Sequence, residues 1–256
     1  RWLRNNTPET EGWLDQAAIP EYGILAPWSA GHVLKYVSRR PVVQDNFGDD
    51  AGVQGFETAR RYFRADDETD ALAQIEGMAV RYIIVRASEN RRRSNRFPGE
   101  MQTRLDRYRG SERWMVEKRQ GGDPVRFAAL ERHRLIYESA PLWPSREPQL
   151  PLYQVFEIVP GARVEGLADP DQLVVARLEI RSPRGSTFEY LNRARADSAG
   201  RWEMHLPYSN GRFSSAIEVA PAYELTSGER RVKLRIPEAA IWSGERVGAP
   251  HLKSEP

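Results

Sequence analysis

The residues best suited to bind a ligand lie in one short stretch, residues 22–32, with the sequence YGILAPWSAGH. An apolar run over Gly23–Ala26 ends in Pro27 and Trp28, and a helical pattern begins at Ser29. Trp28 offers a flat apolar wall and an indole N–H donor, while Ser29 can cap the helix or bond a ligand. Ligands favour the carboxyl ends of strands, and a helix start offers free N–H groups. The stretch predicts a pocket; the alternative is a buried Trp under a capped helix.

Other familiar catalytic patterns do not occur in the sequence. The chain has no cysteine, which removes thiol nucleophiles, thiolate metal sites and disulfides together. Its four histidines are scattered, and none lies at metal-ligand spacing: His32, His133, His205 and His251. Nucleophile elbows, phosphate loops and dinucleotide-binding glycine patterns do not occur either. We therefore expect no catalytic residue, no metal site and no cofactor within this chain.

The composition is that of a globular protein with a packed core. The chain has 256 residues, of which 40% are hydrophobic and 29% charged, enough for one large domain or two ordinary ones. Because 38 Lys and Arg nearly balance 36 Asp and Glu, the net charge is +2 and no nucleic-acid partner is expected. The longest apolar runs, such as Tyr82–Val85, are far shorter than the roughly 20 residues that a membrane helix needs.

The first half alternates short apolar runs with helical patterns, which predicts a short mixed or parallel sheet flanked by helices. Strands are expected over Gly23–Ala26, Pro41–Val43, Tyr82–Val85 and Leu135–Tyr137, and helices over Ser29–Ser38, Gly52–Phe63, Glu68–Met78 and Phe127–Leu130. The apolar residues Val33, Leu34 and Val37 share one face of the first helix. Asp66 or Asp67 is placed to cap the helix that begins near Glu68.

A cluster of prolines between residues 141 and 151 separates two kinds of sequence pattern. Beyond it, strand-like runs are separated by turn residues: Gln154–Val159, Leu173–Ile180, Ser186–Leu191, Arg201–Leu206, Ala216–Ala220 and Arg231–Ile236. Apolar and polar residues alternate through Trp202, Met204 and Leu206, which indicates a half-buried strand. We expect an α+β protein, with an α/β domain over residues 1–148 and an antiparallel β-sandwich or barrel over residues 149–256.

The corner at residues 27–31 resembles a motif of oligosaccharyltransferase catalytic subunits of the archaeal and bacterial type. The motif reads Trp-Trp-Asp-Tyr-Gly, and the register aligns it with Pro27, Trp28, Ser29, Ala30 and Gly31, with His32 following. Trp28 and Gly31 match identically, and the other three positions differ. The resemblance continues in order through Arg40–Phe47, Val80–Val85, Leu135–Ser139, Val155–Ala162 and Leu206–Ser209. The resemblance covers most of the chain in order, which is stronger support than a single short motif gives.

The resemblance implies a role in binding an acceptor polypeptide. In that family the motif holds the hydroxyl residue of an Asn-X-Ser/Thr acceptor, so the residues implied here are Pro27, Trp28, Ser29, Gly31 and His32. With Ser29 in place of the motif aspartate, a charged acceptor for that hydroxyl is missing. The family's catalytic carboxylates and divalent cation, Mn²⁺ or Mg²⁺, lie in a membrane-spanning half outside this chain, which would also reach the lipid-linked oligosaccharide. By itself, the chain is expected to be inactive.

The resemblance also implies a location on the extracytoplasmic face of the membrane, as part of a multi-pass protein. A different class of function is compatible with the altered motif. The chain would then be a non-enzymatic extracytoplasmic module, descended from the same family, that binds protein or carbohydrate. In that case Trp202, Tyr208 or Trp242 would be candidate platforms for sugar stacking, although packing in the core is the commoner role for each.

Overall fold

The protein divides into two compact units that interleave along the chain. The computed structural model describes residues 1–15, 18–45, 53–86, 96–115, 124–141, 151–182 and 186–253. Unit 1 comprises Arg1–Arg107 and Leu135–Ile158, and unit 2 comprises Tyr108–Arg134 and Val159–Pro256. The boundary expected between residues 148 and 149 lies outside the described residues and stays a prediction.

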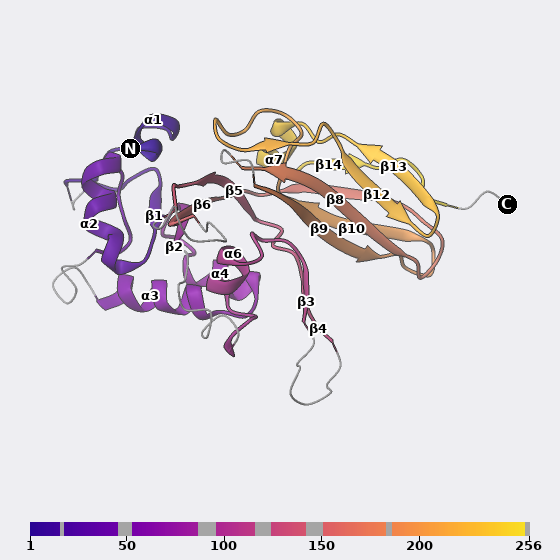
Figure 1. Cartoon of the computed structure of the whole chain (residues 1–256), viewed down its shortest axis with the longest axis horizontal. Helices are drawn as coiled ribbons and strands as arrows, with labels where there is room; N and C mark the ends of the chain where they lie inside the picture. The colour runs from indigo at the N-terminus through magenta and orange to yellow at the C-terminus, as the bar shows by residue number, and fades with distance from the viewer. Residues whose placement is uncertain are drawn as a thin grey trace. The chain divides into compact units, whose positions relative to one another are not determined.

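Unit 1 is built on a mixed sheet with the strand order β1-β2-β6-β5 (Figure 1). Its strands are β1 (Gly23–Leu25), β2 (Val80–Arg86), β5 (His133–Glu138) and β6 (Tyr153–Ile158). β2 lies between β1 and β6, and its successive residues Tyr82, Ile83, Ile84 and Val85 are all buried, so both faces of this strand are covered. β1 runs parallel to β2, and β6 runs antiparallel to it. This confirms the mixed sheet that was expected.

Two expected strands behave differently in unit 1. Pro41–Val43 forms only an isolated parallel bridge, between Ile24 and Val42. Gln154–Val159 was expected in the β-rich half, but this segment forms β6 and pairs with β2 in the first sheet. An alternating strand sequence shows which residues face a core, but it carries no information about which sheet the strand joins.

Unit 1 also contains helices. They are α1 (Trp2–Asn6), η1 (Trp28–Ala30), α2 (Gly31–Leu34), η2 (Lys35–Arg39), α3 (Val53–Arg64), α4 (Glu68–Gln74) and α6 (Met101–Asp106). α3, α4 and α6 gather beside β2 (Figure 1). Asp67 caps α4, because its Oδ1 accepts hydrogen bonds from the backbone N–H groups of Thr69 and Asp70. The second of the two expected capping residues is thus the correct one.

The expected single helix over Ser29–Ser38 is instead three short pieces: the 3₁₀ turn η1, the α-helical turn α2 and the π-helical turn η2. The apolar side chains on it are not buried as a face, since Val33 is 64% exposed and Val37 is 40% exposed. The helical spacing of apolar residues therefore predicted helical structure here correctly, but it did not predict a buried face.

Unit 2 contains two larger sheets and a hairpin. One sheet has the order β10-β7-β14, and the other has β11-β8-β12-β13 with β9 also paired to β8. Their strands are β7 (Ala162–Leu167), β8 (Leu173–Arg181), β9 (Thr187–Arg195), β10 (Arg201–Leu206), β11 (Glu218–Val219), β12 (Tyr223–Ser227), β13 (Arg230–Leu234) and β14 (Arg246–Gly248). The pairs are antiparallel, except that β14 runs parallel to β7. The expected β-rich architecture is confirmed with that exception.

The hairpin of unit 2 consists of β3 (Arg113–Met115) and β4 (Val125–Phe127). The helix expected over Phe127–Leu130 does not form, because Phe127 ends β4 and the following residues adopt no helix. A single helix, α7 (Glu238–Ser243), follows β13 among the described residues of this unit. Neither the hairpin nor α7 was expected from the sequence pattern.

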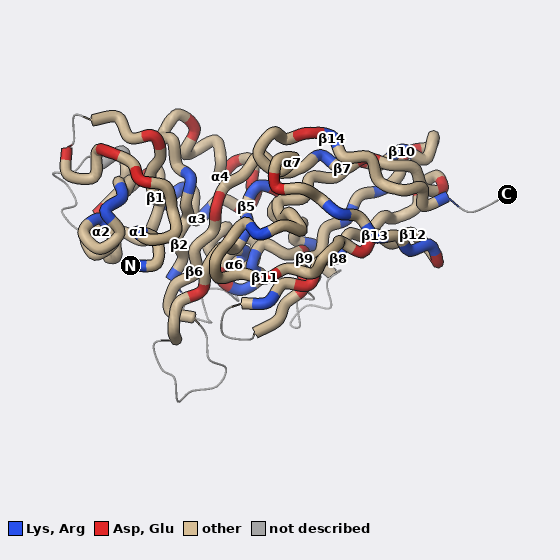
Figure 2. The backbone as a smooth tube through the Cα atoms, turned by 90° about the horizontal axis from the view of Figure 1, so that it is seen from above, with Lys and Arg blue, Asp and Glu red and all other residues tan. Residues whose placement is uncertain are grey.

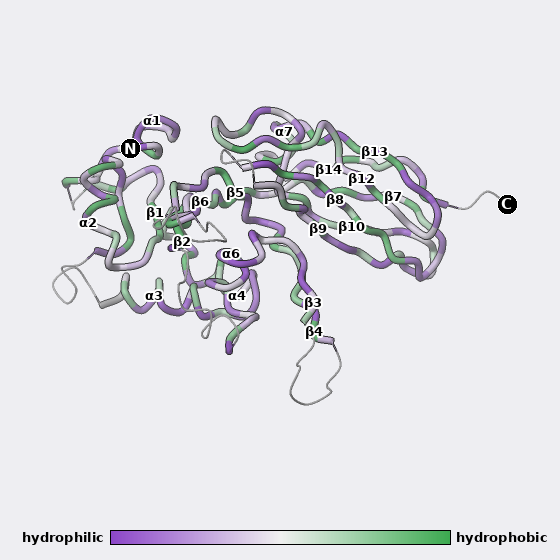
Figure 3. Tube along the Cα trace, in the orientation of Figure 1, coloured by the Kyte–Doolittle hydropathy of each residue, from purple (hydrophilic) through white to green (hydrophobic). Residues whose placement is uncertain are grey.

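Alternation along β10 produces the core of unit 2, as expected. Trp202, Met204 and Leu206 are buried, and the residues between them face outward; Figure 3 shows this mixture of hydrophobic and hydrophilic positions along the strands. The Trp202 indole lies over Gly166 of β7, where an added Cβ would be 2.7 Å from Cζ2 of the ring. Gly166 thus leaves room for a large aromatic side chain.

Candidate functional site

The corner between β1 and α2 exposes two of the expected site residues. Pro27 leaves the strand at φ −55° and ψ 134°, and the 3₁₀ turn that follows is closed by the Ala30 N–H, which donates to the Pro27 carbonyl at 2.9 Å. The fixed φ of proline favours this sharp change of direction. Trp28 is 49% exposed and Ser29 is exposed, whereas Ala30 and Gly31 are buried. The exposure of Trp28 argues against the alternative of a tryptophan that serves only as core packing.

Gly31 is required for a close backbone approach. An added Cβ at this position would lie 2.3 Å from the carbonyl oxygen of Gln44 and 2.4 Å from Cα of Asp45. Because both atoms belong to the backbone, no larger residue fits unless the segment moves. Gln44 provides a second tie to the corner, since its Nε2 donates to the carbonyl of Ala26 at 2.7 Å. Gly31 therefore fixes residues 44 and 45 against the corner rather than offering a side chain to a ligand.

The carboxylate of Asp45 lies beside the corner, although the sequence did not predict it there. Asp45 Oδ2 lies 3.7 Å from Nδ1 of His32 and 4.0 Å from Nζ of Lys35. The Asp45 side chain is only 10% exposed. His32, expected as a site residue, is half-buried and faces this carboxylate. In the sequence, Asp45 belongs only to the segment Arg40–Phe47 that resembles the family, and its separation from Gly31 along the chain gives no sign of their contact.

The structure therefore divides the expected site residues into two groups. Trp28 and Ser29 are open to solvent, with the half-buried Pro27 before them. Gly31 and His32 instead contact residues of the chain itself, on the Gln44–Asp45 side. Only the first group has side chains free to meet an acceptor directly. Their role in acceptor binding stays a prediction.

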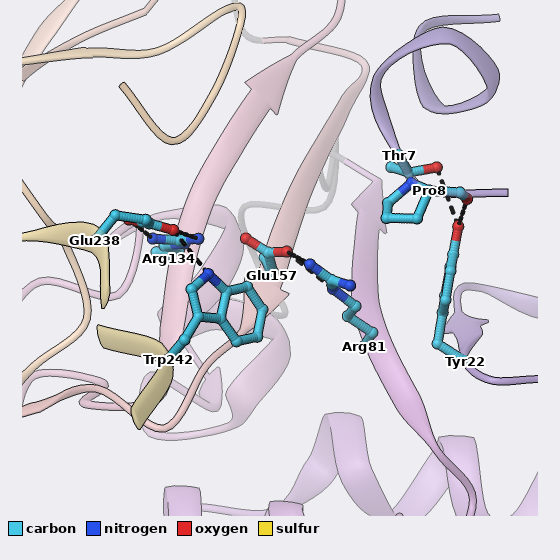
Figure 4. Close-up of polar contacts among 8 residues, drawn as sticks. All are labelled: Thr7, Pro8, Tyr22, Arg81, Arg134, Glu157, Glu238 and Trp242. Carbon is cyan, nitrogen blue, oxygen red and sulfur yellow. Dashed lines mark hydrogen bonds and ion pairs between the residues drawn. The ribbon is translucent and has the colours of Figure 1, made fainter. Parts of the chain in front are cut away.

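A network of polar contacts holds the N-terminal segment near β1. The Tyr22 hydroxyl donates to the Pro8 carbonyl and lies 3.3 Å from Thr7 Oγ1 (Figure 4). The buried guanidinium of Arg40 donates to Thr7 Oγ1 at 3.1 Å and to the Thr7 carbonyl at 2.9 Å. On the sheet, Arg81 pairs with Glu157 at 2.9 Å (Figure 4). These contacts brace the strand that carries the corner.

Several other features bear on ligand binding. Trp202 and Tyr208, considered as stacking platforms, are buried in the core, whereas Trp242 is half-exposed.

Within the part of the chain that the structure describes, no group of three or more His, Asp or Glu residues is placed to hold a metal ion. The described helices include none long and apolar enough to cross a bilayer. Basic and acidic residues are interspersed along the traced backbone (Figure 2), so neither sign of charge dominates.

Two family models match the chain in succession. Residues 1–89 match the AglB core domain, and residues 161–247 match the long peripheral domain of archaeal glycosylation protein B. The first match contains the corner, and the second contains most of the strands of unit 2. The chain belongs to the AglB family of oligosaccharyltransferases. The resemblance found in the sequence is thereby confirmed, and the chain is a C-terminal-type part of such a protein.

Curated AglB relatives match over a limited region. Dolichyl-phosphooligosaccharide-protein glycotransferase 2 of Archaeoglobus fulgidus is 30% identical over 83 residues, which cover 32% of this chain and 13% of the relative. Dolichyl-monophosphooligosaccharide–protein glycotransferase AglB of Haloferax volcanii is 34% identical over 85 residues, covering 28% of this chain and 8% of the relative. The chain thus matches only a small share of the length of these curated relatives.

Solved AglB structures share the fold over nearly the whole chain. The A. fulgidus AglB in complex with an inhibitory peptide and a dolichol-phosphate has a TM-score of 0.71 at 16% identity, covering 91% of this chain and 38% of that one. The A. fulgidus oligosaccharyltransferase in complex with Zn and sulfate has a TM-score of 0.70 at 17% identity, covering 98% and 45%. At such low identity the likeness establishes the fold, and this fold occupies less than half of either structure.

Proposed function

We propose that this chain forms part of the acceptor-binding side of a membrane-bound protein N-glycosyltransferase. The observation that carries the proposal is the half-exposed Trp28, which stands in the register of the family motif at a braced corner of the sheet. A tryptophan kept open at a rigid corner provides a flat apolar surface for a peptide side chain. Ser29, exposed beside it, adds a hydroxyl that can donate or accept.

In this proposal the chain binds and orients the acceptor, and the bond-forming chemistry belongs to the remainder of the parent protein. Holding the acceptor in place converts part of a bimolecular encounter into an intramolecular step. The parent would supply the divalent cation, Mn²⁺ or Mg²⁺, and the site for the lipid-linked oligosaccharide, at the extracytoplasmic face of the membrane. Support comes from relatives whose structures contain Zn and sulfate, or an inhibitory peptide and a dolichol-phosphate.

A peptide-binding titration of the chain tests the proposal. We expect a peptide containing Asn-Val-Thr, the sequon tethered in an A. fulgidus structure, to bind the chain, and Trp28→Ala to weaken binding at least about tenfold, the loss of roughly 1.4 kcal/mol. Trp114 is the matched control, because it is exposed to nearly the same extent, at 48%. Trp114→Ala should leave peptide binding unchanged. Equal binding by the wild-type chain and Trp28→Ala would refute the proposal.

The second candidate is a non-enzymatic module that binds protein or carbohydrate outside the cell. It is favoured by the three positions of the motif that differ, Pro27, Ser29 and Ala30. For a sugar ligand, Trp242 is the remaining candidate platform of the three considered, since the other two are buried. A glycan-binding assay that responds to Trp242→Ala but not to Trp28→Ala would favour this module. Failure of the full-length parent to glycosylate a sequon peptide would point the same way.

A further inference from the structure

We propose that the free edge of β13 is a docking site for an acidic polypeptide segment, which binds there as an additional strand of the sheet. The proposal does not rest on the acceptor-binding function and concerns unit 2 alone. β13 is the last strand in the order β11-β8-β12-β13, so β12 pairs with one of its edges and no described strand pairs with the other. An edge strand presents unpaired N–H and C=O groups that a further chain can bind.

The turn between β12 and β13 determines which backbone groups point outward. Ser227 lies opposite Arg230 across a two-residue turn that begins at Gly228, whose φ is +54°. A turn of this kind is closed by a hydrogen bond between its flanking residues, so Ser227 and Arg230 form a hydrogen-bonded pair. Hydrogen-bonded and non-hydrogen-bonded pairs alternate along an antiparallel ladder. The N–H and C=O groups of Arg231 and Lys233 therefore point away from β12.

These outward groups have no partner among the described residues. Within that part of the chain, the backbones of Arg231 and Lys233 form no hydrogen bond beyond the β12–β13 pair. The Arg231 side chain is 69% exposed and pairs with Glu224 at 3.4 Å. Lys233 and, just past the strand, Arg235 are exposed as well, and no described carboxylate forms an ion pair with either of them. The open backbone edge is therefore lined by cationic side chains.

Charges alternate in sign across the outer face of this sheet, and the row ends on a cation. Arg177 of β8 lies opposite Glu224 of β12, and Glu224 lies opposite Lys233 of β13. Opposite charges that face each other on neighbouring strands stabilise a sheet, and like charges destabilise it. The next position in the row, beyond Lys233, therefore suits a carboxylate.

The occupant that fits this edge is an extended polypeptide with acidic residues at alternate positions. Arg231 and Lys233 are two residues apart on one strand, a spacing of about 6.8 Å, which acidic side chains at alternate positions of an extended chain share. A polypeptide also supplies N–H and C=O groups in alternation, whereas a phosphate-rich polymer or a membrane surface offers acceptors without those N–H donors. A second copy of β13 is disfavoured, because its cations would face these.

The test compares two peptides on the whole chain: Thr-Glu-Val-Glu-Val-Glu-Thr and Thr-Val-Glu-Glu-Glu-Val-Thr, which has the same composition. We expect the first to bind at least about tenfold more tightly, because only its three glutamates share one face of a strand. Lys233→Glu should weaken binding of the first peptide by about tenfold or more. Lys253→Glu is the control and should bind as wild type does. Lys253 is also exposed, but it follows the bridge that Leu252 forms with Ala168 at the end of β7.

Amide hydrogen exchange of the wild-type chain shows whether the peptide joins the sheet. Saturation with the alternating peptide should slow exchange of the Arg231 and Lys233 N–H groups by at least about tenfold. Exchange of the Val232 N–H, which already points toward β12, should stay unchanged. This measurement needs no substitution, so it also covers the case in which Lys233→Glu does not fold.

Each of the contrary outcomes overturns the proposal. Equal binding of the two peptides, or an equal response of Lys233→Glu and Lys253→Glu, would show attraction to negative charge alone. Binding without slowed exchange at Arg231 and Lys233 would show contact without addition of a strand. Binding of neither peptide would leave these cations as protection of the edge against pairing with other strands.

Discussion

The Arg134 guanidinium and the Glu238 carboxylate meet in a bidentate pair, with Nη1 2.9 Å from Oε2 and Nη2 2.7 Å from Oε1 (Figure 4). The Arg134 side chain is 1% exposed, and its charge lies 4.6 Å from the ring centre of Phe213 and 5.5 Å from that of Trp242. Ser209 and Trp242 donate to the same carboxylate. One carboxylate thus gathers the donors that attach α7 to the rest of unit 2.

We expect Glu238→Gln to lower the free energy of unfolding by about 3 kcal/mol, because it leaves the buried Arg134 charge without its counter-ion. Urea denaturation at neutral pH measures the change. Glu189→Gln is the control, since Glu189 pairs with Arg177 on the exposed surface of the same unit and should change stability by less than about 1 kcal/mol. Equal effects of the two substitutions would show that the Arg134 pair contributes no more than a surface pair.

The same carboxylate should make stability depend on pH. Burial raises the pKa of Glu238, but the hydrogen bonds and charge of Arg134, with those of Ser209 and Trp242, outweigh it and hold the pKa below its ordinary value of 4.5. The unfolded chain therefore binds this proton at a higher pH than the folded chain does. The stabilisation is full above 4.5 and is lost as pH falls through the lowered pKa. The stability difference between wild type and Glu238→Gln should shrink below that pH in denaturation series.

The close approach at Gly31 predicts a stability cost that involves no ligand. Gly31→Ala should destabilise the protein by about 1–3 kcal/mol, because the new methyl group meets backbone atoms of Gln44 and Asp45. Gly211→Ala, where an added Cβ meets nothing within 4 Å, is the control and should be neutral. Thermal melts of the two variants measure the difference. An unchanged melting temperature for Gly31→Ala would mean that residues 44 and 45 yield easily.

Two tryptophans with different exposure should respond differently to the same truncation. Trp202→Ala, in the core of unit 2, should cost about 3–5 kcal/mol. Trp28→Ala should cost less than about 1 kcal/mol, since nearly half of its surface is already in water. Denaturation of both variants provides the comparison. A large loss of stability for Trp28→Ala would favour the packing role over the binding role.

Patterns within a few residues predicted the elements that depend on contacts between near neighbours in the sequence. The β10 alternation, the buried run of β2 and the cap at Asp67 were all readable, because each depends on residues within a few positions of one another. The strand-turn-helix corner was readable for the same reason. Its motif register also led to the correct family.

Contacts between residues far apart in the sequence could not be predicted from it. Nothing in the sequence near β6 shows that it pairs with β2 rather than with the strands that follow it. The short strands β7 and β12 were also missed, although buried and less buried residues alternate along both. Asp45 was missed as a neighbour of Gly31 because the two are separated along the chain. A glycine in a motif indicates that something approaches closely, but only the fold shows that Gln44 and Asp45 do so.

The interleaving of the two units has a consequence for the order in which the protein can assemble during synthesis. β6 lies between β2 and β5 in the sheet of unit 1, yet Tyr108–Arg134, a part of unit 2, leaves the ribosome before it. An N-terminal unit usually folds completely before the next unit emerges from the ribosome, but this chain cannot fold in that order. One edge of β2 must wait for Ile158 to be translated, and an unpaired edge is a template for aggregation. A nascent chain stalled at residue 148 should consequently be more dependent on chaperones than one stalled after β6.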